Sequence, residues 1–338
     1  MTTSGMVTTP SVPAWIEPIG WVGKGAIAIL AYLGGVAALL MSAAVSLVSF
    51  SRDDDRPGFW TVLKSELWWL LVAGVPLVAL VHVAMGSFLS MQAYFGSTFV
   101  DGTGAVVGVG LLRNLASLMT GMTLCGLIAC RLVPGHLGQA RAESSSPGLE
   151  HGSAERRENL VGSHPGSELD EHGPSPGDLG REVRKSGRVA APRLVAAAVA
   201  SVLLSLWGFV VGNAVGWQVS AGLMGLPSHV YFQMFYRMIW FRDVVGMMVK
   251  GVLFGIFPAT ICSYEGLRVA HRASAGAGGA GEMQNRDGNG SNGLSGPVVR
   301  AVCLSMSAIL LINMTWFLLV YHAVPVYGPS LLQPPPIP

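Results

Sequence analysis

A few polar or ionisable side chains lie inside or at the edge of long apolar segments of this sequence. A charge in the hydrocarbon of a bilayer is expensive, so each such position is a candidate for binding, for proton transfer or for a structural ion pair. These positions are His82, Arg113 with its neighbour Asn114, Asp243 and Lys250.

The spacing of these residues indicates what they can contact. Asp243 and Lys250 are seven residues apart, so two helical turns place them on one face roughly 10 Å apart. This is too far for a direct ion pair along one helix, so each is expected to pair with another segment. Arg113 and Asn114 are interpreted either as a polar anchor facing a cavity or as a hydrogen-bonded pair within a bundle. His82 has no carboxylate near it in sequence, which favours a buried core histidine over a proton relay.

The sequence carries no pattern typical of an enzyme. It has no G-x-x-x-x-G-K-[ST] loop, no H-E-x-x-H and no G-x-S-x-G. The glycine-rich run at 102–110 opens an apolar segment, so close helix packing explains it better than phosphate binding. We therefore expect no catalytic residue, cofactor or metal, and we expect four free thiols packed in apolar segments. These are Cys125, Cys130, Cys262 and Cys303.

The composition indicates which elements hold these residues. Of 338 residues, 51% are hydrophobic and 12% are charged, about half the usual charged share of a soluble domain. The mean hydropathy is +0.51. We predict an all-α membrane protein, because several apolar stretches reach the roughly 20 residues that a bilayer span needs. The five spans are predicted over 67–89, 104–133, 189–217, 244–267 and 297–321.

Two other hydrophobic segments are assigned differently. Residues 25–50 are long enough to span, but they are rich in Gly, Ala and Ser, which favours a helix in the membrane interface. The aromatic segment 218–243 suits a helix at the membrane surface. The net charge of +2 and the lack of a basic, aromatic run give no sign of a nucleic-acid partner.

Two polar stretches, 134–187 and 271–296, have few large apolar residues and are predicted to be disordered. Nine Lys and Arg residues lie in the connection 131–193 and four in 268–300, which places both connections in the cytosol by the positive-inside rule. The N-terminal segment, with four more, is also expected in the cytosol. Five spans then put the C-terminus outside, which holds only if 25–50 does not cross. The chain is accordingly divided into an N-terminal segment 1–66, two spans in 67–133, a linker 134–187, two spans with the aromatic segment in 188–270, a loop 271–296, a last span 297–321 and a proline-rich tail 322–338.

Three runs resemble the MlaE/YrbE permeases, the membrane subunits of lipid-transporting ABC systems. DVVGMMVKGVLFGIFPATICSYEGL at 243–267 is similar to the family's D-V-x-x-x-x-x-K-[SA]-x-x-F-G…Y-x-G-L stretch. GVGLLRNLASLMTGMTLCG at 108–126 resembles its L-x-R-E-L-G-P-V segment, and 297–319 resembles its last span. A weaker match at 88–95 includes Gln92. The matching positions of the other runs are Arg113, Asp243, Lys250, Phe254, Gly255, Tyr264, Gly266, Arg300 and Asn313.

The resemblance implies a permease in the bacterial inner membrane that forms a homo- or heterodimer. It implies a separate cytosolic ABC ATPase, an MCE-domain lipid-binding partner and a phospholipid substrate taken from membrane lipids. Gln92, Arg113 and Asn114 are then candidates for polar lining of the lipid cavity. Glu265, at a cytosolic end that water is expected to reach, and Arg131 are candidates for the ATPase contact.

The sequence departs from this family at two places. The family's R-E-L-G-P is Arg113-Asn114-Leu115-Ala116-Ser117 here, so a carboxylate is missing. The region implied to dock on the ATPase is replaced by CRLVPGHLGQAR and the polar linker. A transport-inactive scaffold or partner subunit of the same descent therefore stays as the alternative.

Overall fold

The computed structural model describes residues 17–50, 57–96, 103–145, 176–277 and 292–322, and all regular structure in these ranges is helical. The expectation of an all-α membrane protein is thus confirmed. The helices are α1 (Glu17–Phe50), α2 (Pro57–Gly96), α3 (Thr103–Gly110), the π-helix η2 (Leu111–Leu115), α4 (Ala116–Ser145), α6 (Pro176–Met224), α7 (Ser228–Met238), α8 (Phe241–Ala277), α9 (Asn292–Phe317) and the π-helix η4 (Leu318–His322).

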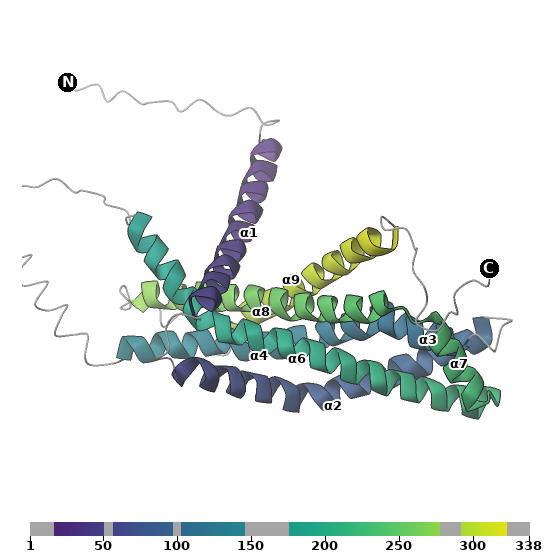
Figure 1. The fold of residues 1–338 in the computed structure, drawn as a ribbon. Helices are drawn as coiled ribbons and strands as arrows, with labels where there is room; N and C mark the ends of the chain where they lie inside the picture. Colours follow the sequence, from purple (N-terminus) through teal and green to yellow (C-terminus); the bar gives the residue numbers. More distant parts are fainter. Residues whose placement is uncertain (1–16, 51–56, 97–102, 146–175, 278–291, 323–338) are drawn as a thin grey trace, which may run out of the picture.

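Six helical stretches of the described chain are long and apolar enough to cross a bilayer. Five of them cover the five predicted spans except for residues 104–105 and 321, and the sixth is Gly23–Val48 in α1. Figure 1 shows α1 running across the direction shared by α2, α4, α6 and α8 rather than alongside them. A membrane-interface position for α1, which we predicted from its composition, remains a prediction that this direction supports.

The core of the bundle is formed by α4, α6 and α8, with α2 packed along α6. Small residues allow these helices to approach closely. A Cβ on Gly86 would meet the carbonyl of Gly212, which joins α2 to α6. By contrast, only 11% of the span windows of α1 and α9 is buried, against 61% for the window in η2 and α4. The outer helices therefore keep most of their apolar surface available to lipid or to another subunit.

The observed helices extend beyond the predicted spans. α2 begins at Pro57, α4 continues to Ser145, and α6 begins at Pro176. The prediction of disorder over 134–187 is therefore wrong at both ends, and the same holds for 271–296, since α8 ends at Ala277 and α9 begins at Asn292. A helix already formed in the membrane extends easily into flanking helix-forming residues. The central parts, 146–175 and 278–291, and the tail after 322 lie outside the described residues.

Of the aromatic segment 218–243, residues 228–238 form helix α7, which packs on α3, while 218–224 belong to α6 and 241–243 to α8. Its position at the membrane surface stays a prediction. A Cβ on Gly104 would meet the carbonyl of Tyr231, and one on Gly108 would meet the ring of Phe235. Close packing thus explains these two glycines of the 102–110 run, as the sequence predicted, whereas Gly110 faces open space.

A first prediction concerns the contact of α8 with α6. A Cβ on Gly255 would lie 2.6 Å from Ala198 Cα, which is backbone that cannot move aside. We expect Gly255→Ala to lower the free energy of unfolding by about 2 kcal/mol in a thermal or denaturant titration in detergent. Gly126→Ala is the matched control, because nothing lies within 4 Å of its Cβ position and alanine favours a helix. Equal stability of the two variants would contradict the packing described here.

Candidate functional site

Asp243 begins the first of two groups of buried charges. It lies in the first turn of α8, where a carboxylate complements the helix dipole. Its Oδ2 accepts a hydrogen bond from the Trp240 N–H at 3.2 Å, and its own N–H donates to the Trp240 carbonyl at 2.9 Å. The carboxylate thus makes the side-chain half of a capping box, and the return bond is an ordinary backbone turn bond. The same carboxylate forms an ion pair with Arg113 Nε at 3.1 Å, so it joins the start of α8 to η2.

Lys250 lies two turns further along α8 than Asp243 and contacts the same arginine. Its buried ammonium donates a hydrogen bond to the carbonyl oxygen of Arg113. Asp243 and Lys250 therefore both pair with another segment, as their spacing predicted, and both meet one residue. Arg113 Nη2 also lies 3.4 Å from the Met238 carbonyl. We call Arg113, Asp243 and Lys250 the charged triad.

The backbone around Arg113 explains how its carbonyl can accept a side-chain hydrogen bond. Leu111–Leu115 is a π-helix, and the Ala116 N–H bonds back to the Leu111 carbonyl. A π-turn inserts one extra residue into a helix and interrupts the regular hydrogen-bond ladder, so a carbonyl can turn towards another partner. No residue pattern in the sequence predicted this turn.

The predicted lining residues are only partly brought together. The Arg113 side chain is 35% exposed, Asn114 beside it is half-buried, and Gln92 is exposed near the end of α2. Polar groups at the same end of the bundle include Tyr231, whose hydroxyl donates to Asn213 Oδ1 at 3.0 Å. Burial raises the pKa of Tyr231, so this hydroxyl keeps its proton.

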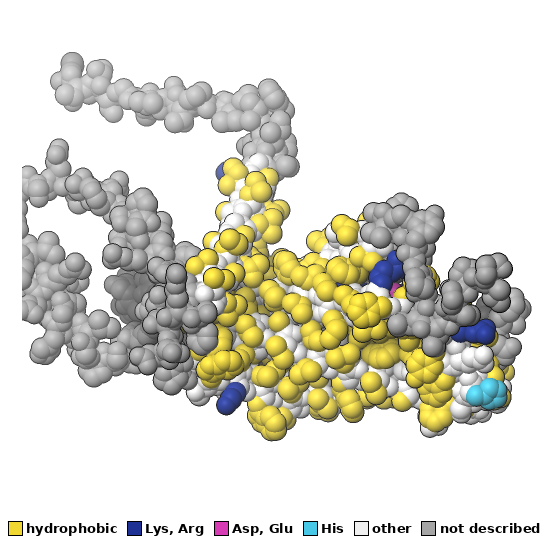
Figure 2. All heavy atoms as spheres, viewed as in Figure 1, with side chains coloured by type: hydrophobic (Ala, Val, Ile, Leu, Met, Phe, Trp, Pro, Cys, Tyr) yellow, Lys and Arg dark blue, Asp and Glu magenta, His cyan; other side chains and the backbone are white. Residues whose placement is uncertain are grey.

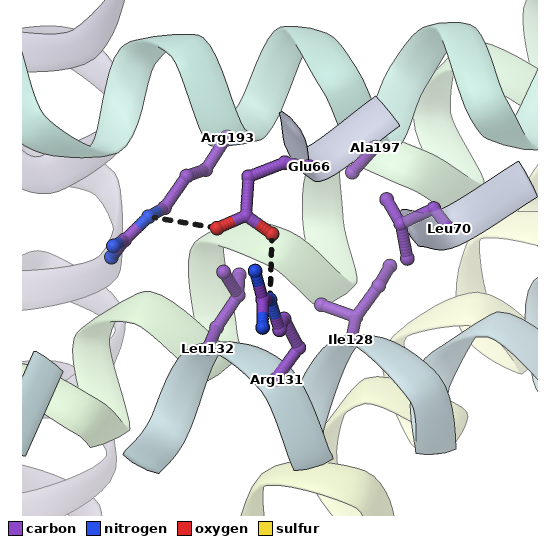
Figure 3. Close-up of a pocket in the computed structure, with 7 residues that line it drawn as sticks. All are labelled: Glu66, Leu70, Ile128, Arg131, Leu132, Arg193 and Ala197. Atoms are coloured by element: carbon purple, nitrogen blue, oxygen red, sulfur yellow. Dashed lines mark hydrogen bonds and ion pairs between the residues drawn. The ribbon is translucent and has the colours of Figure 1, made fainter. Parts of the chain in front are cut away.

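The second group of charges lies at the opposite end of the bundle, from which the 146–175 and 278–291 connections leave. Glu66 of α2 pairs there with two arginines, as Figure 3 shows. The carboxylate lies 3.1 Å from Arg131 Nε and 3.7 Å from Arg193 Nε. Arg193 Nη1 in turn lies 3.2 Å from Nε2 of the buried His136. Sequence reasoning missed Glu66, Arg193 and His136, because each lies at a segment boundary where polar residues are ordinary.

The Glu265 carboxylate forms ion pairs with two more arginines at this end. It accepts from Arg300 Nε at 3.0 Å and pairs with Arg268 Nη1 at 3.5 Å. Its side chain is 0% exposed, so the expectation that water reaches Glu265 is wrong. The exposed groups are the arginines, with Arg300 42% exposed. Arg268 also lies 5.8 Å from the ring centres of Tyr32 and Tyr264, a cation–π contact that ties α1 to α8.

The remaining positions of the family resemblance lie in helix contacts. Phe254 is buried against Gly121, and Gly266 faces the ring of His136. Asn313 is half-buried in α9. Among the described residues no group of three or more His, Cys, Asp or Glu could hold a metal ion. All four thiols are free, as predicted; Cys125 and Cys262 are buried, and Cys130 and Cys303 are exposed.

The His82 side chain is buried within the bundle, as the sequence favoured. Its Nδ1 lies 2.8 Å from the Val78 carbonyl one turn earlier in α2. The ring packs against Gly208 of α6, where a Cβ would come 2.5 Å from its Cε1. These contacts show that His82 packs in the interface between α2 and α6.

Comparison with known proteins finds a family model and two relatives that are similar to this chain. Residues 181–319, which contain most of α6 and all of α7, α8 and α9, match the family model described as Permease MlaE. A probable ABC transporter permease protein of Rickettsia typhi is 22% identical over 227 residues, which is 66% of this chain and 76% of that relative. A second, from Rickettsia bellii, is 20% identical over 248 residues, 72% of this chain and 82% of that relative.

Proposed function

Because the chain is a divergent member of the MlaE permease family, and so an ABC transporter permease, we propose that it moves phospholipid or a related lipid. The transfer would link the inner membrane with a periplasmic MCE-type carrier. ATP hydrolysis would be performed by a separate ATPase subunit.

The charged triad is the observation that carries this proposal. Asp243 and Lys250 lie in the family-matched α8, and they meet Arg113 from a segment outside that match. The triad is therefore a polar site, partly open at Arg113, at one end of a bundle whose sides are mostly apolar. A lipid needs this combination: apolar surface for its chains and a few polar groups for its head. We propose Arg113, with Asn114 and Gln92, as the polar lining.

The apolar surfaces support a dimer and a lipid path. Figure 2 shows almost continuous hydrophobic side chains along one face of the bundle, with charges near its ends. α1 and α9 are the least buried of the six apolar helices. We propose that a second permease, identical or related, covers part of this surface and leaves a cavity between the subunits.

The ATPase contact is assigned to the end that carries Glu265. Since Glu265 is buried, its role would be to hold Arg268 and Arg300 in place, and these arginines would meet the ATPase. An exposed guanidinium suits a carboxylate on a partner protein. This assignment replaces Glu265 itself as the contact.

One observation favours the alternative, a transport-inactive scaffold. Position 114 carries an amide where the resembling family has a carboxylate, and the structure leaves Lys250 with a carbonyl partner at Arg113. The segment that contacts Lys250 therefore has no carboxylate at position 114 whose charge could change during a transport cycle.

Co-purification and reconstitution test both readings. We expect the detergent-extracted chain to bring down an ABC ATPase and an MCE-domain protein. In proteoliposomes containing these partners, labelled phospholipid should exchange with the MCE protein in the presence of ATP and not of a non-hydrolysable analogue. Recovery of the partners without ATP-dependent exchange would support the scaffold, and recovery of neither partner would contradict both.

A further inference from the structure

A small pocket between α2, α4 and α6 combines charged and apolar walls, and Figure 3 shows its residues converging from the three helices. The two arginines lie on either side of the Glu66 carboxylate, and aliphatic side chains close the remaining walls. We call it the Arg131 pocket. It is lined by Glu66, Leu70, Ile128, Arg131, Leu132, Arg193 and Ala197.

The charges in this pocket do not balance. Two guanidinium groups face one carboxylate, which leaves one net positive charge, and His136 beyond Arg193 adds no negative charge. Arg193 is 8% exposed, and its Nε faces the Glu66 carboxylate at 3.7 Å without forming a hydrogen bond to any described residue. A buried guanidinium with unused donors beside a net positive charge favours an anion with several acceptor oxygens.

Arg131 provides the accessible donors. Its side chain is 41% exposed, and it binds Glu66 through Nε alone. Within the described part of the chain, its two terminal nitrogens donate to no other residue. A planar guanidinium held at one nitrogen can offer the other two to a phosphate in a bidentate contact.

The pocket lies at the depth of lipid head groups. Arg131 is stacked over the ring of Trp69, 5.4 Å from its centre, and the neighbouring Trp68 is strongly exposed. Tryptophans favour the level at which head groups meet hydrocarbon. Arg131 is also five residues from the end of the apolar window Val106–His136. Basic pockets between membrane helices on the cytoplasmic side are typical sites for acidic lipid head groups.

We propose that the Arg131 pocket holds the phosphate group of an anionic phospholipid from the adjacent leaflet. Arg131 donates to the phosphate oxygens, and Arg193 adds positive charge on the other side of the Glu66 carboxylate. The acyl chains extend from the phosphate along the outer face of α2, where Trp68 is exposed. This lipid is a resident of the membrane domain, so the inference does not depend on what the protein transports.

Native mass spectrometry of the full-length chain in detergent tests this inference. The protein would be titrated with phosphatidylglycerol, with phosphatidylcholine and with inorganic phosphate. We expect phosphatidylglycerol to bind most tightly and Arg131→Gln to weaken it by roughly fivefold to tenfold. Arg237→Gln is the matched control, since Arg237 is an exposed arginine of α7 at the opposite end of the bundle, and it should leave the affinity unchanged.

A second variant separates binding from damage to the fold. Glu66→Gln removes the carboxylate that competes with phosphate, so it should strengthen phosphatidylglycerol binding, whereas mere structural damage would weaken it. Equal affinities of Arg131→Gln and Arg237→Gln would overturn the proposal. So would displacement of the lipid by equimolar inorganic phosphate, which would indicate a site for free anions. Unchanged lipid binding with loss of ATPase co-purification in Arg131→Gln would identify a protein contact instead and would equally overturn it.

Discussion

Replacing Asp243 with asparagine should lower the free energy of unfolding by about 2 kcal/mol and abolish ATP-dependent lipid exchange. The variant removes the carboxylate that pairs with Arg113, and breaking a buried ion pair from one side is strongly destabilising. Asparagine can still accept the Trp240 N–H through its amide oxygen, so the start of α8 should persist. Unfolding in detergent gives the stability, and exchange in proteoliposomes gives the activity.

Lys250→Met is the control that distinguishes structure from function at the charged triad. Methionine fills a similar volume, and the substitution leaves the Asp243–Arg113 ion pair intact, so neither of these charges loses its partner. We expect unfolding within about 1 kcal/mol of the wild type but lipid exchange reduced at least tenfold, because the polar point of the cavity has changed. Full exchange in Lys250→Met would assign Lys250 to structure alone.

Glu265→Gln should have the second large effect, at the other end of the bundle. The amide cannot neutralise Arg268 and Arg300, which converge on this buried carboxylate from α8 and α9. We expect a loss of about 3 kcal/mol in the free energy of unfolding. Since α9 is otherwise little buried, its N-terminal turns should open more often, with faster amide hydrogen exchange.

The matched comparison for Glu265→Gln is Glu66→Gln. Both residues are buried glutamates held by two arginines at the same end. Glu66 joins α2, α4 and α6, so its replacement should leave amide hydrogen exchange in α9 unchanged. Similar exchange in α9 for both variants would show that Glu265 does not anchor this helix.

The fold was largely predictable because hydropathy is a local property. Twenty or so apolar residues in a row have few options other than a membrane helix, and the five predicted spans are all helical. The triad was predictable in part. The distance between Asp243 and Lys250 along one helix indicated that each needs another segment, but it could not indicate that both meet Arg113, some 130 residues earlier.

The π-helix and the two buried glutamate clusters depend on tertiary contacts that no local sequence pattern encodes. The π-helix at Leu111–Leu115 has ordinary helix-forming residues, so only its contacts with α8 distinguish it. Glu265 lies at a segment end where water was expected, and pairing with arginines of α8 and α9 buries it. Glu66 and Arg193 are also polar residues at span boundaries, and only the approach of α2 to α6 makes them partners.

The distance between Arg113 and Lys250 in the chain has a consequence for synthesis at the ribosome. They are 137 residues apart, which at about 5–20 residues per second separates their appearance by roughly 7–27 s. During that time the span holding Arg113 is in or near the translocon without either α8 partner. An arginine within a lone helix raises the insertion free energy, by up to about 2.5–3.5 kcal/mol when it is at the helix centre, and Arg113 lies in the first third of its span. We expect this helix to remain beside the translocon or an insertase until α8 emerges, and Arg113→Leu to release it into lipid earlier.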